Sequence, residues 1–402
     1  MTSPTVSVIV VSQQRPDALR LCLTGVLKLN YTPFEVIVVA DQSGLSVAQG
    51  LSDQIKTVAF DAANICAARN AGLNAAGGQV VAFIDDDAVP EPQWLRHLIA
   101  PFARGDVAAA GGFVRGRNGI TFQWKARMAF ADGTSVPFDV DGMSIHKSTL
   151  GRAIKTEGTN MAFRRDVLVK LGGFDPRFAF YLDETDVNMR LAAQGAKTAI
   201  VPLAQVHHGF AASARRTQDR VPRSLFEIGA SSAVFASKHD RDIAQTRFAA
   251  RRTQRNRLLR FMTRGDLVPS DVRKLMATFD KGWDVGAARK VVPVTIGPAP
   301  AFEPVHALAT HSDHIVVSGR YLHKRKVLEE AARAAQDGTQ VSAYVFTFTS
   351  IFHRVQFHVG GYWLQTGGQF GRSVRGSRLF QYWTQRSRVE HEVNRVKTVR
   401  ET

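Results

Sequence analysis

Three consecutive carboxylates, Asp85, Asp86 and Asp87, directly follow the apolar run 80–84, which is rich in β-branched residues. Such a run predicts a buried strand, so the acids would stand where this strand leaves its sheet at the carboxyl end. In open α/β sheets, ligands bind in the crevice beyond these strand ends. Adjacent like charges stay ionised at low cost when a cation lies between them, and Mg²⁺ or Mn²⁺ commonly bridges carboxylates to phosphate. The triplet therefore predicts a docking place for a metal and a diphosphate, with a solvated acidic turn as the alternative.

A second acidic group, Asp183, Glu184 and Asp186, opens a helix that we expect over 182–194. A carboxylate positioned beside a hydroxyl can act as a general base, so one of the three is a candidate for that role. Carboxylates at a helix N-terminus are also stabilised by the helix dipole, and capping of the helix is the competing interpretation. Asp186 has a further alternative, because it can pair with Arg190 one turn later.

The elements that must position these acids alternate between strand and helix in the first part of the chain, which predicts an α/β fold with a mostly parallel sheet. Residues 115–157 lack a clear period and are rich in Gly and Asp, so we expect a long loop region there. The expected elements are strands over 6–11, 34–40, 55–60, 80–84 and 107–114, and helices over 18–29, 64–76 and 91–103.

Composition limits the class of protein. The 402 residues contain 52 Lys and Arg against 35 Asp and Glu, a net charge of +17. The basic residues concentrate in 211–260 and 351–402, whereas 1–150 is nearly neutral. Two cysteines exclude a disulfide framework, the N-terminus lacks the features of a secretory signal, and no apolar run is long enough to cross a membrane. We therefore expect a cytoplasmic protein.

The order and spacing of several motifs resemble a known family. They are SVIVVSQQRPDAL, NICAARNAGLNAA, FIDDD, GTNMAFRRD, GGFD and DETDVNMRL. Together they are similar to the inverting glycosyltransferases of family 2, which have the GT-A fold, over roughly residues 5–215. The resemblance implies transfer of a sugar from a nucleotide-diphosphate donor to a hydroxyl acceptor, in the setting of bacterial surface polysaccharide biosynthesis.

The same resemblance implies roles for individual residues. Asp85 and Asp87 match the family's DxD acids, and Asp87 would ligate Mn²⁺ or Mg²⁺. A histidine downstream often completes the metal site, and either His207 or His208 fits that place; a histidine ligand would favour Mn²⁺. Glu184 falls at the position of the family's catalytic base, although the usual Glu-Asp order is reversed here, which leaves Asp183 and Asp186 as alternatives. The residues implied in binding the donor are Asp41, Arg69, Asn70, Asp85, Asp86 and Asn160.

The implied organisation has three parts. A GT-A glycosyltransferase domain over 1–215 is followed by a basic helical extension and linker over 216–300, and by a small α/β C-terminal domain of unknown role over 301–402. The acceptor would be a glycan or a lipid-linked glycan. The basic helices suit either a solvated surface or peripheral contact with the cytoplasmic face of the membrane. For the C-terminal segment, dimerisation to a homo-oligomer, acceptor binding and membrane contact stay open.

The competing hypothesis is a nucleic-acid- or membrane-binding basic protein built on a catalytically inactive GT-A scaffold. Nucleic-acid binding predicts aromatic residues interleaved with Lys and Arg on one surface. Here the basic residues cluster outside the acid-lined half of the chain, so no nucleic-acid partner is expected.

Overall fold

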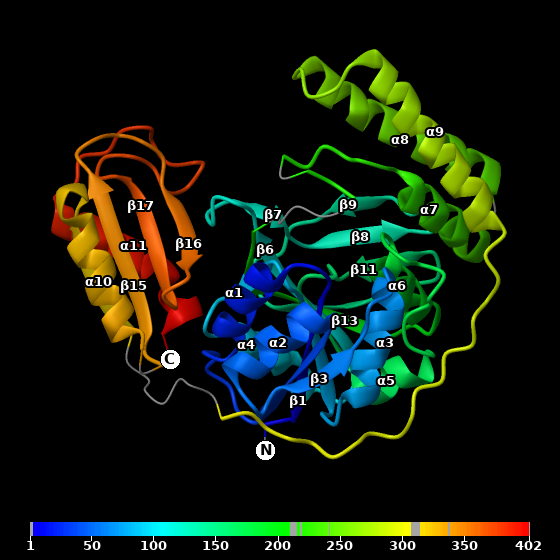
Figure 1. Cartoon of the computed structure of the whole chain (residues 1–402), viewed down its shortest axis with the longest axis horizontal. Coiled ribbons are helices and arrows are strands. Elements are labelled where there is room, and N and C mark those ends of the chain that lie inside the picture. Colours follow the sequence, from blue (N-terminus) through cyan, green and yellow to red (C-terminus); the bar gives the residue numbers. More distant parts are fainter. Residues whose placement is uncertain are drawn as a thin grey trace.

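A large mixed sheet forms the centre of the first part of the protein (Figure 1). The computed structural model describes residues 3–209, 215–217, 219–240, 242–306, 314–336 and 338–401. The sheet order is β10-β13-β6-β12-β4-β1-β2-β3, with β5 added on β13 and β7 on β6. Its strands are β1 (Val6–Ser12), β2 (Phe34–Ala40), β3 (Lys56–Ala59), β4 (Val80–Asp85), β5 (Ala88–Pro90), β6 (Val107–Arg115), β7 (Phe122–Trp124), β10 (Ser144–Lys147), β12 (Met161–Arg164) and β13 (Lys197–His208).

The longest ladders of this sheet are parallel. Strands β3, β2, β1 and β4 run parallel to one another, as do β6 and β13, while β12 is antiparallel between β4 and β6. The apolar β-branched runs of β1, β2 and β4 are buried, because helices cover both faces of a sheet of this kind. The predicted α/β class with a mostly parallel central sheet is confirmed.

Two hydrophobic layers hold helices against the two faces of the sheet. Helices α1, α2 and α4 contribute to one layer, and α3, α5 and α6 contribute to the other. Helix α2 was not expected from the sequence. Asp41 begins it, because its side chain accepts the backbone N–H of Gly44. The helices are α1 (Pro16–Val26), α2 (Gln42–Leu51), α3 (Ile65–Ala75), α4 (Trp94–Ile99), α5 (Arg165–Lys170) and α6 (Asp183–Ala193), and the 3-10 helix η1 (Ala100–Ala103) extends α4.

The prediction of a long loop over 115–157 is wrong. This region forms β7 and β10 of the central sheet, and β8 (Arg127–Phe130), β9 (Ser135–Pro137) and β11 (Arg152–Lys155), which make a separate three-stranded sheet. Each of these strands has three or four residues. A strand of three or four residues contains at most two repeats of the apolar–polar alternation. The alternation is therefore too short to be recognised in the sequence.

A helical unit follows the central sheet and lies above it in Figure 1. It consists of α7 (Phe226–His239), α8 (Ile243–Thr263) and α9 (Pro269–Ala287), packed around a core that contains Phe279 and Trp283. After α9 the chain runs as an extended segment along the first part of the protein, where Val305 N–H donates to the carbonyl of Phe34. In the part of the chain that the structure describes, no helix is long and apolar enough to cross a membrane.

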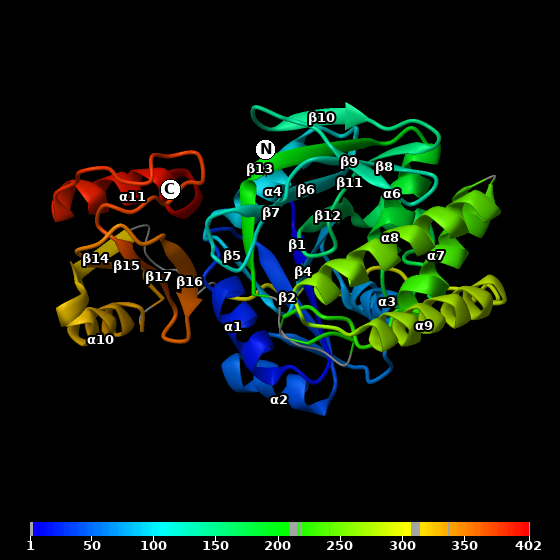
Figure 2. The same ribbon diagram turned by 90° about the horizontal axis from the view of Figure 1, so that it is seen from above.

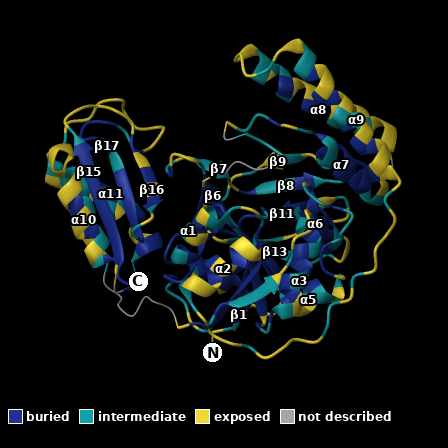
Figure 3. Ribbon diagram, in the orientation of Figure 1, coloured by how far each residue is buried: buried dark blue, intermediate teal, exposed yellow. Residues whose placement is uncertain are grey.

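The C-terminal part has a sheet of its own, in the order β14-β15-β17-β16, with α10 and α11 beside it (Figure 2). The prediction that this C-terminal segment is of the α/β class is confirmed. Figure 3 shows that the buried residues of this sheet lie on its strands, as in the central sheet. The elements are β14 (His314–Arg320), the 3-10 helix η2 (Tyr321–His323), α10 (Lys324–Ala334), β15 (Gln340–Thr347), β16 (Arg354–His358), β17 (Tyr362–Gly368) and α11 (Gln385–Arg400).

Buried polar contacts fix the C-terminal part against the first part. Lys28 Nζ on the α1 side donates to the carbonyl oxygens of Ala335 at 2.8 Å and Gly361 at 3.0 Å. Arg400, at the end of α11, pairs with Glu91 at 2.8 Å, and both side chains are almost completely buried. Buried charges are stable only when they are paired in this way, so these contacts define one relative placement of the two parts. The division of the chain at 215 and 300 stays a prediction.

Candidate active site

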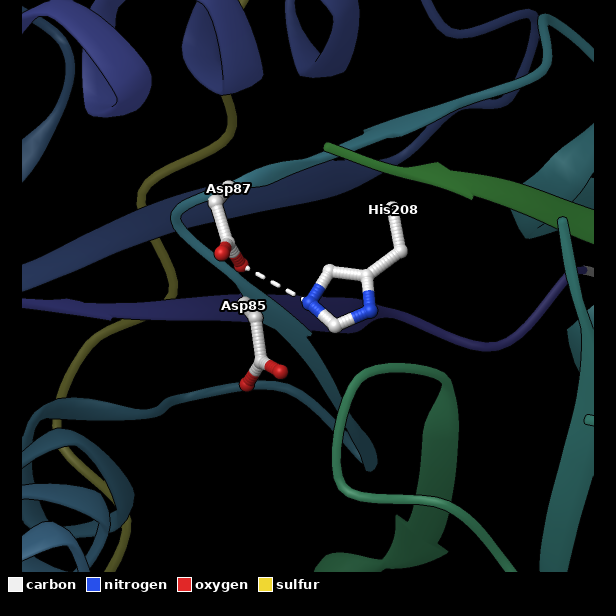
Figure 4. Close-up of side chains that lie close together, drawn as sticks. All are labelled: Asp85, Asp87 and His208. Atoms are coloured by element: carbon white, nitrogen blue, oxygen red, sulfur yellow. Dashed lines mark ion pairs between the residues drawn. The ribbon is translucent and has the colours of Figure 1, made fainter. Parts of the chain in front are cut away.

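The carboxyl end of β4 carries the predicted acidic triplet, and β13 brings a histidine to it. Asp85, Asp87 and His208 each offer a ligand atom, and these atoms lie within 4.8 Å of one another. His208 Nε2 is 3.1 Å from Asp87 Oδ1, the pair joined in Figure 4. The cause is the antiparallel pairing of β5 with the end of β13, which sets His208 opposite Ala88. Two carboxylates and one imidazole form a donor set that suits Mn²⁺ or Mg²⁺.

The middle acid of the triplet points away from this group. Asp86 is fully buried, accepts the hydroxyl of Ser12 at 2.7 Å and pairs with Arg15 at 2.5 Å. Burial raises the pKa of Asp86 to about 7, against the effect of Arg15. Burial also disfavours the charge of Asp87, but His208, Arg15 and Arg216 outweigh it and lower its pKa well below the ordinary range. Asp87 is therefore ionised at neutral pH, whereas Asp86 pairs with Arg15, and its predicted contact with the donor stays a prediction.

One cavity of about 890 Å³ is lined by two acids of each cluster that the sequence singled out, Asp85 and Asp87 from the first and Asp183 and Glu184 from the second. It opens at the carboxyl ends of the central strands, between β4, the start of α6 and helix α8. Its lining includes Arg15, Arg69, Asp85, Asp87, Trp124, Lys155, Asp183, Glu184, His208 and Arg216. A cavity of this size accommodates a nucleotide-sized ligand together with part of a second substrate.

The acids of α6 face the cavity because of the backbone that precedes them. Tyr181 and Leu182 both have positive φ, of 77° and 62°. This left-handed conformation is uncommon for residues other than glycine, and such strain concentrates at functional sites. It turns the chain sharply into α6, so that Asp183 and Glu184 line the cavity.

Arg69 joins the two clusters. It forms a tight ion pair with Asp183 and lies 3.6 Å from Asp85. Burial raises the pKa of Asp183 to about 7, and Arg69 opposes this shift. Glu184 pairs instead with Lys155 at 3.2 Å. Although burial opposes it, Lys155 and the backbone at the helix start lower the pKa of Glu184, which is therefore a carboxylate at neutral pH.

Comparison with known proteins identifies a family for part of the chain. Residues 7–172 match the model of Glycosyl transferase family 2. The region is a glycosyltransferase family 2 domain. The predicted resemblance to family 2 is therefore confirmed over these residues.

Curated relatives match parts of the chain. The O-antigen biosynthesis protein RfbC of Myxococcus xanthus is 28% identical over 249 residues, which are 55% of this chain and 18% of that protein. The glucosyl-dolichyl phosphate glucuronosyltransferase of Haloferax volcanii is 29% identical over 183 residues, which are 42% of this chain and 56% of that protein. The chain thus spans less than two thirds of the length of either relative.

Solved structures resemble the fold more distantly. The mannosyltransferase PcManGT from Pyrobaculum calidifontis, in complex with GDP-Man and Mn²⁺, has a TM-score of 0.44 and 16% identity, and the match covers 71% of this chain and 88% of that one. GalNAc-T7 with UDP, GalNAc and Mn²⁺ has a TM-score of 0.45 and 18% identity, and the match covers 59% of this chain and 48% of that one.

Several residues that the family resemblance implied as site residues have other partners. Asn160 is fully buried, accepts the indole N–H of Trp94 at 2.8 Å and donates to two backbone carbonyls. Asn70 accepts the N–H of Phe174 and donates to its carbonyl oxygen. Neither asparagine lines the cavity. Both side chains hold the strands and turns around the site, and their predicted contact with the donor stays a prediction.

Asp186 and His207 are also directed away from the cavity. Asp186 is fully buried and pairs with Arg190, Lys238 and His239, which agrees with the helix-pairing interpretation. Its role as a general base stays an untested alternative. His207 Nε2 is 2.8 Å from Glu91, on the side of the C-terminal sheet. Neighbouring residues of a strand point to opposite faces, so β13 can direct only one of the two histidines to the acids. That one is His208.

Asp41 caps α2 and accepts the N–H of Gln14 at 2.5 Å, outside the cavity lining. Its predicted contact with the donor nucleoside stays a prediction. Sequence reasoning missed Arg15 and Lys155, which both line the cavity. The hydroxyl of Thr159, next to Asn160, donates to Asp85. For Arg15 a signal exists, because it follows β1 at the same sheet edge as the acids.

Proposed function

We propose that this protein is a metal-dependent inverting glycosyltransferase that moves a sugar from a nucleotide-diphosphate donor to a hydroxyl acceptor. The observation that carries the proposal is the single cavity that contains both the Asp85, Asp87 and His208 group and the acids at the start of α6. A donor and an acceptor must meet in one place for direct displacement, and a shared cavity allows this.

The donor side is the half of the cavity at β4. Asp85, Asp87 and His208 would hold the divalent cation, which neutralises the negative charge that grows on the departing diphosphate. Arg15 and Arg216 lie 3.2 Å and 3.7 Å from Asp87, so further positive charge is present where a diphosphate would bind. Mn²⁺ is the better fit to a site that includes a histidine.

The acceptor side is the half at α6. Glu184 is the proposed general base, because it lines the cavity, is ionised at neutral pH and is held by Lys155. Asp183 is occupied by Arg69 and positions that guanidinium between the two clusters. Displacement by an acceptor hydroxyl in one step, with no protein nucleophile, inverts the configuration of the transferred sugar.

The biological setting is part of the proposal. The O-antigen relative supports a role in the biosynthesis of a surface polysaccharide, with a glycan or lipid-linked glycan as acceptor. The proposed organisation is the glycosyltransferase domain over 1–215, the helical extension and linker over 216–300 and the C-terminal α/β domain over 301–402. Peripheral contact with a membrane and oligomerisation are expectations that the comparisons do not support.

A donor screen tests the proposal. Purified protein with Mn²⁺ is offered a panel of nucleotide sugars, and the release of nucleoside diphosphate is measured with and without EDTA. We expect release from one donor class and its loss with EDTA and in Asp87→Asn. Absence of release from every donor, together with absence of Mn²⁺-dependent nucleotide binding, would refute the proposal.

A further inference from the structure

The wall of the cavity opposite β4 is formed by arginines of α8. Arg257, Arg260 and Arg264 line the cavity, and Gln254 and Phe261 lie on the same helix face. Residues three and four apart on a helix are neighbours, so these three guanidinium groups form one row along the cavity. In Figure 1 helix α8 lies above the central sheet, on the side of β7, β8 and β9.

The row begins beside the acceptor side of the site. Tyr181, which precedes the acids of α6, lines the cavity. Burial raises the pKa of its phenol, and Lys155, Glu184 and Arg257 are the charges near enough to act on it. Arg257 therefore lies near Tyr181, which directly precedes the acids of α6, and Arg216, which contacts Asp87, also acts on it.

The positive charge of this row is only partly neutralised by nearby carboxylates. Among the residues that the structure describes, no carboxylate forms an ion pair with Arg257 or Arg260, whereas Arg264 is 3.3 Å from Asp266. Burial and then the charge of Arg216 lower the pKa of Arg257, although the phenol of Tyr181 opposes them. An excess of guanidinium charge beside a cavity favours an oxyanion, because a guanidinium binds carboxylate and phosphate with two parallel hydrogen bonds.

We propose that the acceptor is an anionic glycan, and that Arg257 and Arg260 bind its carboxylate or phosphodiester oxygens while its hydroxyl faces Glu184. The proposal deepens the proposed function and rests on it. A neutral glycan would leave these guanidinium groups without the ligand that they suit. Arg260 and Arg264 are exposed, but both line the same cavity as the acids, and half-buried Arg257 lies between them and Tyr181, so the row favours an acceptor over a membrane surface.

Binding without donor tests this inference separately from turnover. Calorimetry compares the full chain with short oligogalacturonates, with the same oligomers as neutral methyl esters, and with short glycerol phosphate oligomers. The first and third probes distinguish a carboxylate from a phosphodiester. The variant R257Q/R260Q removes both charges, and R257K/R260K keeps them. The matched control is R252Q/R255Q, two exposed arginines of the same helix outside the cavity lining.

We expect either the oligogalacturonates or the glycerol phosphate oligomers to bind. The neutral methyl esters should bind at least tenfold more weakly than the anionic probe that binds. Each charge-assisted contact is worth about tenfold in affinity, so R257Q/R260Q should lose roughly a hundredfold and the control variant nothing. R257K/R260K should recover part of the loss.

Equal affinity for charged and neutral oligomers, in a protein that still binds nucleotide with Mn²⁺, would overturn the anionic acceptor and leave the glycosyltransferase proposal intact. Vesicles with phosphatidylglycerol are the remaining arm. If they bind through Arg257 and Arg260 while the oligomers do not, the row serves a membrane surface and the acceptor inference is wrong.

Discussion

Replacement of Glu184 by glutamine removes the proposed base and keeps its shape. Glutamine still reaches Lys155, which is 3.2 Å from the carboxylate, so the fold around α6 should persist. Loss of a positioned general base costs about 10²- to 10⁴-fold in rate, which corresponds to about 3–5 kcal/mol in the activation barrier. Glu184 is not part of the candidate metal site of Asp85, Asp87 and His208, so the affinity for the donor should not change.

The assay is the initial rate of nucleoside diphosphate release at saturating donor and acceptor, with nucleotide affinity measured by calorimetry in Mn²⁺. We expect kcat to fall by the stated factor and the Kd of the nucleotide to stay at its wild-type value. Asp183→Asn is the comparison, because Asp183 holds Arg69 and should affect donor affinity as well as rate. Wild-type turnover by Glu184→Gln, with loss of turnover but unchanged nucleotide affinity in Asp183→Asn, would show that the base is Asp183.

Three further changes test the surroundings of the site. Asn160→Ala should lower the Tm, because it leaves the buried partners of Asn160 without a hydrogen bond and each such group costs about 1–3 kcal/mol. The affinity for nucleotide in Mn²⁺ should stay unchanged. A loss of this affinity without a loss of stability would show that Asn160 contacts the donor. Arg400→Met leaves Glu91 without its main partner and should cost about 3–5 kcal/mol in urea unfolding; an unchanged midpoint would contradict the buried pair. Burial opposes the charge of Glu392, but Arg395 and the neighbouring hydrogen bonds lower its pKa to about 2. Ionised Glu392 therefore contributes about 3 kcal/mol to the free energy of unfolding. This contribution is fully present above the ordinary pKa of a glutamate and is lost as the pH falls to about 2. The free energy of unfolding of Glu392→Gln should lack this pH dependence. Identical pH profiles of unfolding in wild type and variant would refute the assigned role of Glu392.

The parts of the site that the sequence predicted are local. The acidic triplet was placed correctly at the end of β4, because an apolar β-branched run followed by polar residues is a strand and its end. The helix with Asp183 and Glu184 was predicted for the same reason. The cavity that the two acidic clusters share depends on the tertiary structure, and no local sequence pattern predicts it.

The parts that could not be predicted depend on partners far along the chain. His207 and His208 are equivalent in the sequence, and only the pairing of β13 with β5 decides which one faces Asp87. Asn160 has a family position typical of a site residue, but its side chain bonds to Trp94, 66 residues earlier. Such contacts arise from packing, which is why a motif locates a site better than it assigns each residue.

The proposed function depends most on the candidate metal site formed by Asp85, Asp87 and His208 at the carboxyl end of β4. The direct measurement is an electron paramagnetic resonance titration of Mn²⁺ into the protein with a nucleoside diphosphate present. Asp87→Asn and His208→Asn are compared with Asp106→Asn, an aspartate outside the cavity lining. We predict one bound Mn²⁺ in wild type and in the control variant, and at least tenfold weaker binding in the two site variants, since each removes one ligand. Mn²⁺ binding of equal affinity in all four proteins would contradict the account.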